Sequence, residues 1–181
     1  LTVTSDDTSE GTVNSPLTFT PVNWDTPQTV TVTGADDSII DGTVTSSITV
    51  AVDDANSDND FDAVADQTVS VDTTDDDVAG FTIVELDGAT EVDESGTTDT
   101  FTVVLDAEPA TDVVLTVTSD DTSEATVNSP LTFTPANWDT PQIVTVTGAD
   151  DDLVDGTITS KVKVAVDVVH WSEGCGSLIG Q

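Results

Sequence analysis

The chain has 181 residues, with 36 Asp or Glu against only 2 Lys or Arg, which gives it a formal net charge of −34 at pH 7. Such a charge excludes nucleic acids and anionic membrane surfaces as partners, because both would be repelled. The single cysteine excludes a disulfide within the chain, and no apolar run reaches the length of about 18 residues that membrane insertion requires.

The first part of the chain recurs near its end. Residues 1–53 and 115–167 are identical at 43 of 53 positions. The repeat distance of 114 residues is a normal size for one domain with its own core. We therefore expect residues 1–77 to be a partial repeat without its first two strands, and residues 78–167 to be a second repeat without its last strand. Residues 168–181 match nothing in the first copy and form a tail.

The first copy begins with residues 1–5, where apolar and polar side chains alternate and predict a strand. Residues 17–37 predict a strand, a tight corner around Trp24, a further strand and an acidic loop. Residues 67–72 predict the last strand of the repeat. Because prolines on both sides fix the corner, we expect Trp24 to close one end of the core, like Trp138 in the second copy.

A long acidic loop at residues 53–66 precedes that last strand. Asp54 and Asp58 belong to a run in which Asp and Asn alternate, as in a calcium-binding loop. An EF-hand requires Gly at the sixth position and Glu at the twelfth, where this loop has Asn59 and Ala65. The loop is therefore not an EF-hand, and it either holds an ion of its own or meets the acidic end of a preceding domain.

The second copy predicts six further strands by the same alternation. They cover residues 79–86, 98–106, 113–119, 125–133, 143–148 and 156–167. With the strand at 67–72 as the pattern for its seventh, the complete unit consists of short antiparallel strands separated by turns, which is typical of a β-sandwich. The expected fold class is all-β, with tandem Ig-like antiparallel β-sandwich domains arranged end to end.

Acidic residues fall at alternate turns of this pattern. If every strand reverses direction, the turns after the first, third and fifth strands and the end of the seventh lie at one end of the domain. These segments hold Asp6, Asp7, Asp36, Asp37, Asp41, Asp75, Asp76 and Asp77 in the first copy, and Glu91, Glu94, Asp120, Asp121, Asp150, Asp151 and Asp155 in the second. Carboxylates held close together take up protons or recruit cations, and Ca²⁺ prefers such hard oxygen ligands. A solvated acidic rim that only aids solubility is the alternative.

These residues resemble a known family. The strand order and the motifs Glu94-Ser95-Gly96, Asp120-Asp121, Phe133-Thr134-Pro135, Asp150-Asp151 and Asp75-Asp76-Asp77 are similar to those of Calx-β domains. Closely similar repeats occur in very large bacterial surface and secreted proteins, including repeat-in-toxin adhesins. The resemblance covers about residues 1–167 and implies that the acidic end binds several Ca²⁺ ions. The family has further Glu residues after the second Asp pair, where this chain has Asp41-Gly42 and Asp155-Gly156.

No feature favours catalysis, so we expect the chain not to be an enzyme. The only histidine, His170, lies outside the repeats. We expect a calcium-binding structural repeat on the bacterial cell surface or outside the cell, acting as a Ca²⁺-rigidified spacer of an adhesin or surface protein. Its partners would be neighbouring repeats of the same chain or identical protomers. Because the chain begins inside a repeat, it reads as part of a longer polypeptide.

An alternative is a self-assembling extracellular matrix filament whose open strand edges are joined by strand donation and calcium. A carbohydrate-binding module would need exposed aromatic side chains in a groove, and aromatic residues make up only 4% of the chain. No residue identifies an adhesion target.

Overall fold

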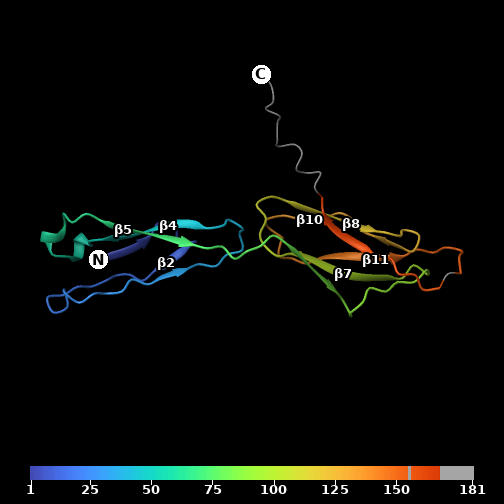
Figure 1. Ribbon diagram of the computed structural model, residues 1–181, viewed down its shortest axis with the longest axis horizontal. Coiled ribbons are helices and arrows are strands. Elements are labelled where there is room, and N and C mark those ends of the chain that lie inside the picture. The colour runs from blue at the N-terminus through green and yellow to red at the C-terminus, as the bar shows by residue number, and fades with distance from the viewer. Residues whose placement is uncertain (155, 168–181) are drawn as a thin grey trace, which may run out of the picture. The chain divides into compact units, whose positions relative to one another are not determined.

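The structure, a computed structural model, describes residues 1–154 and 156–167 (Figure 1). Apart from two short 3₁₀ helices, its regular secondary structure consists of antiparallel β-strands, which confirms the all-β prediction. The chain divides into two compact units, Leu1–Asp77 and Val78–Gln181. Asp155 and the predicted tail at 168–181, which contains His170, lie outside the described residues.

No helix within the described part of the chain is long and apolar enough to cross a membrane.

The first unit has two small sheets with antiparallel pairing throughout. One sheet has the order β1–β4–β5 and contains β1 (Thr2–Ser5), β4 (Val44–Ala51) and β5 (Gln67–Thr73). The other sheet pairs β2 (Gly11–Val13) with β3 (Val32–Gly34). Because the second sheet has only these two strands, the buried core is limited to Val3, Leu17 and Ile48.

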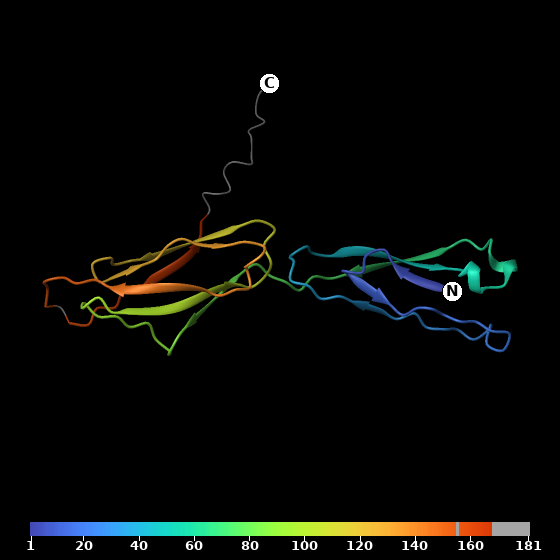
Figure 2. The same ribbon diagram turned by 180° about the vertical axis from the view of Figure 1, so that it is seen from behind.

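Two short 3₁₀ helices, η1 (Asp54–Asn56) and η2 (Asn59–Phe61), lie in the loop between β4 and β5. This loop is at the opposite end of the unit from the loop that joins β3 to β4, as both views show (Figures 1 and 2). We call the end with the β3–β4 loop the acidic end of the first unit.

The second unit contains the larger core. One sheet has the order β6–β7–β11–β9, with β6 (Phe81–Glu85), β7 (Thr98–Leu105), β11 (Gln142–Gly148) and β9 (Ala125–Val127). The other has the order β10–β8–β12, with β10 (Leu131–Phe133), β8 (Val113–Ser119) and β12 (Val162–Val166). Alternate residues of β7, including Phe101 and Val103, pack against Leu115, Phe133 and Val144 of the other strands. The two-residue period in the sequence thus marks the face that each strand buries.

The predicted single strand at 125–133 is wrong. The structure has two strands there, because β9 pairs with β11 and β10 pairs with β8 in the opposite sheet. The chain crosses between the sheets at Ser129 and Pro130, and proline cannot donate a hydrogen bond to a strand ladder. The predicted strand at 156–167 is also shorter than expected, since β12 covers only Val162–Val166.

The two tryptophan corners have different surroundings. Trp138 packs against the core of the second unit, and its main-chain oxygen accepts a hydrogen bond from the N–H of Leu105 in β7 at 3.2 Å. Trp24 is 71% exposed, so the expectation that it closes the core is wrong for the first unit. The reason is that no strand equivalent to β7 lies beside it among the described residues of that unit.

Candidate metal centre

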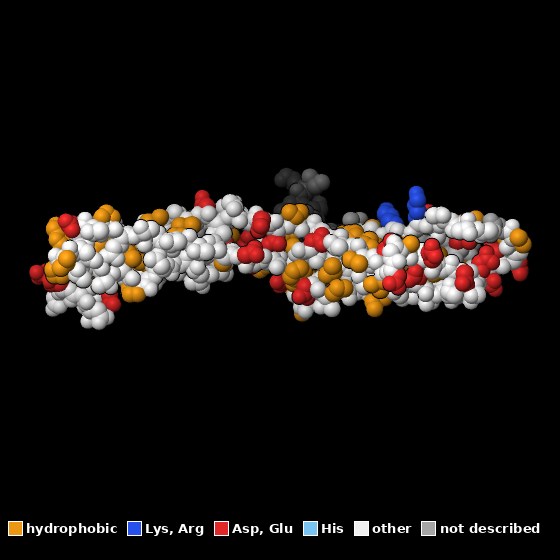
Figure 3. Space-filling view, turned by 90° about the horizontal axis from the view of Figure 1, so that it is seen from below, with side chains coloured by type: hydrophobic (Ala, Val, Ile, Leu, Met, Phe, Trp, Pro, Cys, Tyr) orange, Lys and Arg blue, Asp and Glu red, His pale blue; other side chains and the backbone are white. Residues whose placement is uncertain are grey.

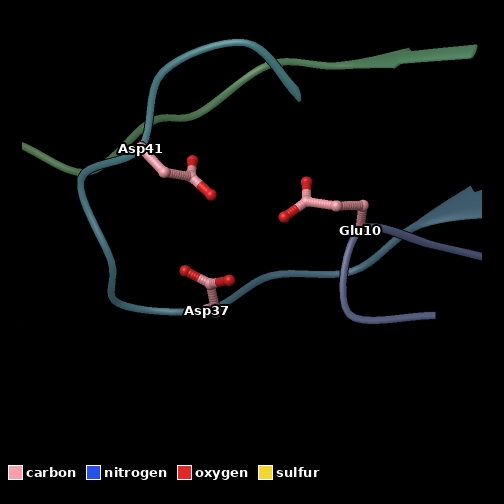
Figure 4. A group of neighbouring side chains, drawn as sticks. All are labelled: Glu10, Asp37 and Asp41. Carbon is pink, nitrogen blue, oxygen red and sulfur yellow. The ribbon is translucent and has the colours of Figure 1, made fainter. Parts of the chain in front are cut away.

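Three carboxylates meet at the acidic end of the first unit. Glu10 directly precedes β2, and Asp37 and Asp41 lie in the loop between β3 and β4. One oxygen of each side chain lies within 4.8 Å of the others, and all three side chains point toward a common centre (Figure 4). Oxygens that bind one Ca²⁺ at about 2.3–2.6 Å are at most about 5 Å apart. The three carboxylates could therefore share one ion with little rearrangement.

Hydrogen bonds from both sheets hold Glu10 in this place. Its main-chain oxygen accepts a hydrogen bond from the N–H of Ala35 at 2.9 Å and one from the Thr73 hydroxyl at 3.2 Å. Ala35 follows β3 and Thr73 ends β5, so Glu10 is fixed where β2 begins and where β3 and β5 end. Its side chain is buried, with only 8% of the residue exposed.

The loop that carries the other two carboxylates is held by hydrogen bonds to aspartates. Asp37 accepts a hydrogen bond from the N–H of Ile39 at 2.8 Å, which closes a turn inside the loop. Asp75, just after β5, accepts hydrogen bonds from the N–H groups of Asp41 at 3.1 Å and Gly42 at 2.9 Å. Gly42 has a φ of 78°, a conformation that favours glycine. Asp75 therefore positions the loop that presents Asp41.

The pKa values at this end separate two kinds of carboxylate. Burial, followed by the negative charges of Asp41, Asp7 and Asp37, raises the pKa of Glu10. The N–H groups of Gly42, Asp77 and Asp41 lower the pKa of Asp75, although burial opposes them. The charge of Asp75 is thus stabilised by the backbone, whereas the charge of Glu10 lacks such compensation and would be stabilised by a cation.

The last aspartate of the unit behaves like Glu10. Burial, followed by the charges of Asp75, Asp76, Asp36 and Asp37, raises the pKa of Asp77.

A small pocket lies at the centre of this group, and seven of its ten lining residues are acidic. We call it the acidic pocket; it is lined by Glu10, Ala35, Asp36, Asp37, Asp41, Thr73, Thr74, Asp75, Asp76 and Asp77. The centre of a water-sized sphere can move within a volume of about 20 Å³ inside this pocket. That space suits one ion or water molecule and is too small for an organic ligand.

Asp6 and Asp7 were predicted to join this group, but they do not line the pocket. Asp6 accepts a hydrogen bond from the N–H of Ser47 at 2.7 Å and extends the pairing of β1 with β4. Asp7 accepts hydrogen bonds from the hydroxyl and N–H of Ser9, which lower its pKa. Both side chains are thus hydrogen-bonded to serines that do not line the pocket.

The predicted ligands in the β4–β5 loop also lie away from the acidic pocket. Asp54 begins η1, and Asp58 caps η2 by accepting a hydrogen bond from the N–H of Asp60 at 3.1 Å. These residues are at the opposite end of the unit (Figures 1 and 2).

The second unit repeats the scaffold of the acidic end. The main-chain oxygen of Glu124 accepts a hydrogen bond from Ala149 at 2.8 Å, as that of Glu10 does from Ala35. Asp151 accepts a hydrogen bond from the N–H of Leu153 at 2.7 Å, as Asp37 does from Ile39.

Apart from Asp155, the remaining predicted ligands of the second unit fall at the same end as Glu124 and Asp151. Asp120 binds the N–H of Lys161 at 2.6 Å, and Asp121 bonds to Ser123. The turn that contains Glu91 and Glu94 reaches the end of β11, where the N–H of Gly148 donates to Thr97 at 3.0 Å. Asp150 follows directly in the sequence. Among the described residues, a group of three acidic side chains close enough to one another to share a metal ion occurs only in the first unit. Asp155, the counterpart of Asp41 in the second unit, is not one of the described residues.

Sequence reasoning missed Glu10. A signal for it was present, because Glu10 and Glu124 occupy the same repeat position and each directly precedes a short strand. Pairs of aspartates are more conspicuous in the sequence, but the hydrogen bonds that turn them inward or outward depend on the folded loops.

Acidic side chains are also spread over the visible face of both units (Figure 3). The two lysines, Lys161 and Lys163, are both exposed and lie on either side of Val162, the first residue of β12. Neither lysine lines the acidic pocket.

Comparison of the chain with protein-family models, with curated proteins and with solved structures gave no match.

Proposed function

We propose that the chain is a calcium-binding structural repeat that acts as a Ca²⁺-rigidified spacer in an extracellular bacterial adhesin or surface protein. The observation that carries the proposal is the cluster of Glu10, Asp37 and Asp41, three carboxylates from two loops that lie within ligand distance of one another. The resemblance of the repeat to Calx-β domains supports the same conclusion.

The chemistry of the acidic pocket favours a hard cation. Its acidic residues offer carboxylate oxygens, and none of its lining residues is His or Cys. Oxygen ligands of this kind suit Ca²⁺ or Mg²⁺ rather than the softer transition metals. We choose Ca²⁺ because ligands on loops can adapt to its variable coordination, whereas Mg²⁺ demands a near-ideal octahedron.

Bound calcium would connect the two sheets of the first unit. Glu10 lies at the start of β2, Asp41 lies in the loop before β4, and Asp75 ties that loop to the end of β5. Without a cation, the repulsion among these carboxylates works against the closed arrangement. With a cation, the binding free energy adds to the stability of the folded unit. The ion would thus cross-link and stabilise the unit, as disulfides do in many secreted domains.

Thermal unfolding with and without calcium tests the proposal. When free Ca²⁺ exceeds its Kd by roughly 100-fold, linkage adds about 2.7 kcal/mol. For a unit of this size that corresponds to a rise in Tm of roughly 10 to 20 °C. The measurement compares millimolar Ca²⁺, millimolar Mg²⁺ and chelator in the full chain. A Tm that is the same in all three solutions contradicts the proposal.

A further inference from the structure

A turn with an unusual backbone conformation follows β6 in the second unit. β6 ends at Glu85, and the turn after it contains Asp87 and Gly88. Their φ angles are 63° and 100°, and Asp87 is the only residue other than glycine with a positive φ in the described part of the chain. Two successive residues with positive φ are typical of a type I′ turn, for which Asp–Gly is a preferred sequence. The dipeptide itself therefore accounts for the turn.

This turn is open to solvent. Asp87 and Gly88 are both exposed, and a Cβ added to Gly88 would meet no atom within 4 Å. The green segment after β6 forms a corner that projects from the body of the second unit (Figures 1 and 2). Within the described residues, no group accepts a hydrogen bond from the N–H of Gly88. No described hydrogen bond therefore restrains this amide.

An Asp–Gly amide without restraint can react with its own side chain. The Gly88 nitrogen bonds to Cγ of the protonated Asp87 carboxyl group, and the hydroxyl of that group leaves with the amide proton as water. The product is a five-membered succinimide ring. Water then adds to one of the two ring carbonyls and opens the ring, which gives either aspartate or isoaspartate. Glycine favours ring closure because it has no Cβ to obstruct the approach of its nitrogen.

The same dipeptide in the first unit has a restrained amide. The N–H of Gly42 donates a hydrogen bond to the Asp75 carboxylate at 2.9 Å, and the N–H of Asp41 donates to it at 3.1 Å. Before the Gly42 nitrogen can attack the Asp41 side chain, it must give up a hydrogen bond to a charged acceptor, which is stronger than one between neutral groups. Asp41–Gly42 is therefore an internal reference with the same sequence in a different environment.

We propose that Asp87 is a site of spontaneous isoaspartate formation in the folded protein, and that the hydrogen bonds to Asp75 protect Asp41 from the same reaction. The modification consumes no reagent, because the water released on ring closure is matched by the water that opens the ring. It adds one methylene group to the main chain between β6 and β7. Asp87 does not line the acidic pocket, so the proposal does not depend on calcium.

Ageing of the full chain tests the proposal. The folded chain is kept in chelator and mildly acidic buffer for several weeks, beside a sample unfolded in guanidinium chloride. Cleavage after glutamate releases residues 86–91 as one peptide, and electron-transfer fragmentation identifies isoaspartate at each site. In the folded chain we expect at least about tenfold more isoaspartate at Asp87 than at Asp41, because the protecting hydrogen bonds involve a charged group. In the unfolded chain the two sites should react at similar rates.

Variants assign the reaction to its residues. Asp87→Glu keeps the charge but would have to close a larger ring, so total isoaspartate in the folded chain, measured with an isoaspartyl methyltransferase, should fall to background. Asp75→Ala removes the acceptor of the Gly42 N–H and should raise isoaspartate at Asp41 by about tenfold. Asp76→Ala is the matched control, because it removes an equal charge from the next residue and leaves the hydrogen bonds to Asp75 in place. Thermal melts show whether each variant is folded.

Three results overturn the proposal. The first is an equal amount of isoaspartate at Asp87 and Asp41 in the folded chain. The second is an unmodified Asp87 in the folded chain while the unfolded chain reacts. The third is an Asp75→Ala variant that keeps its fold and leaves Asp41 unmodified. If Asp75→Ala does not fold, the comparison of the two sites in the wild type still decides, and every sample is in chelator, so the calcium proposal is tested separately.

Discussion

Asp75 accepts a hydrogen bond from the N–H of Gly42 at 2.9 Å, and this bond ties the end of β5 to the loop that carries Asp41. The same carboxylate also binds the N–H groups of Asp41 and Asp77. A residue outside the cluster of Glu10, Asp37 and Asp41 thus sets the position of one of its members.

Replacing Asp75 by Asn should weaken calcium binding. The amide has one oxygen where the carboxylate has two, so it cannot accept all three backbone hydrogen bonds. We expect calcium affinity to fall by about tenfold or more, as for other residues that support metal ligands. Calorimetric titration of Asp75→Asn measures this loss. Asp66→Asn removes the same charge at an exposed position at the end of the β4–β5 loop, and this variant should bind calcium like the wild type. An equal loss of affinity in both variants would show a general charge effect.

Glu10→Gln should have opposite effects on the melting temperature in chelator and in calcium. In chelator the variant should melt at a higher temperature than the wild type, because it removes a buried negative charge beside Asp41 and Asp37. In calcium it should lose most of the calcium-induced rise in Tm, because a strong ligand is missing. Asp25→Asn, at an exposed position in the corner, removes the same charge away from the pocket. If both variants respond alike to calcium, the cluster is not the binding site.

The pH dependence of stability in chelator should have two separate ranges. The raised pKa values of Glu10 and Asp77 mean that the folded state holds these protons more tightly than the unfolded state. Their charging therefore lowers stability as the pH rises above about 4, the ordinary range of such groups. Asp75 has a lowered pKa, so its contribution is present above that range and is lost as the pH falls below about 4.

We thus expect the Tm in chelator to rise as the pH is lowered toward the raised pKa values of Glu10 and Asp77, and to fall again in stronger acid. The rise should be smaller in Glu10→Gln. A Tm that falls steadily from pH 7 downward would contradict the raised pKa of Glu10.

Gly148→Ala and Gly34→Ala should differ in their effect on stability. The added methyl group would overlap the Asp93 main chain in the second unit, whereas in the first unit it has room. We expect Gly148→Ala to destabilise its unit by about 1–3 kcal/mol and Gly34→Ala to change stability by less than about 0.5 kcal/mol. Denaturant unfolding of the full chain measures both. Equal effects would mean that β11 and β3 have the same neighbours.

The sequence predicted the strands better than their partners. The alternation of Val113, Leu115 and Val117 predicted the bounds of β8 as the structure has them. The same alternation ran through Pro130 and concealed the crossing between sheets, because periodicity reports which face is buried and not which strand lies alongside. Trp24 shows the same limit, since its local sequence matches that of Trp138 while the strand that would cover it is not local.

For the candidate site, strand direction predicted which loops share an end of the unit. It could not predict which carboxylates face one another. Asp6 extends a strand pairing and Asp37 closes a turn while still reaching the pocket. These differences arise from backbone hydrogen bonds that form only in the folded loops. Other hydrogen bonds, from Ala35 and Thr73, hold Glu10 at the pocket.

Calcium titration followed by NMR of the backbone amides tests the central claim most directly. If the acidic pocket binds Ca²⁺, the amide signals of Glu10 and of residues 37–42 should shift with one common, saturable dependence on calcium concentration. Shifts that do not saturate and that are spread evenly over the acidic residues of the chain would instead show a diffuse atmosphere of ions, and would contradict a calcium site formed by Glu10, Asp37 and Asp41.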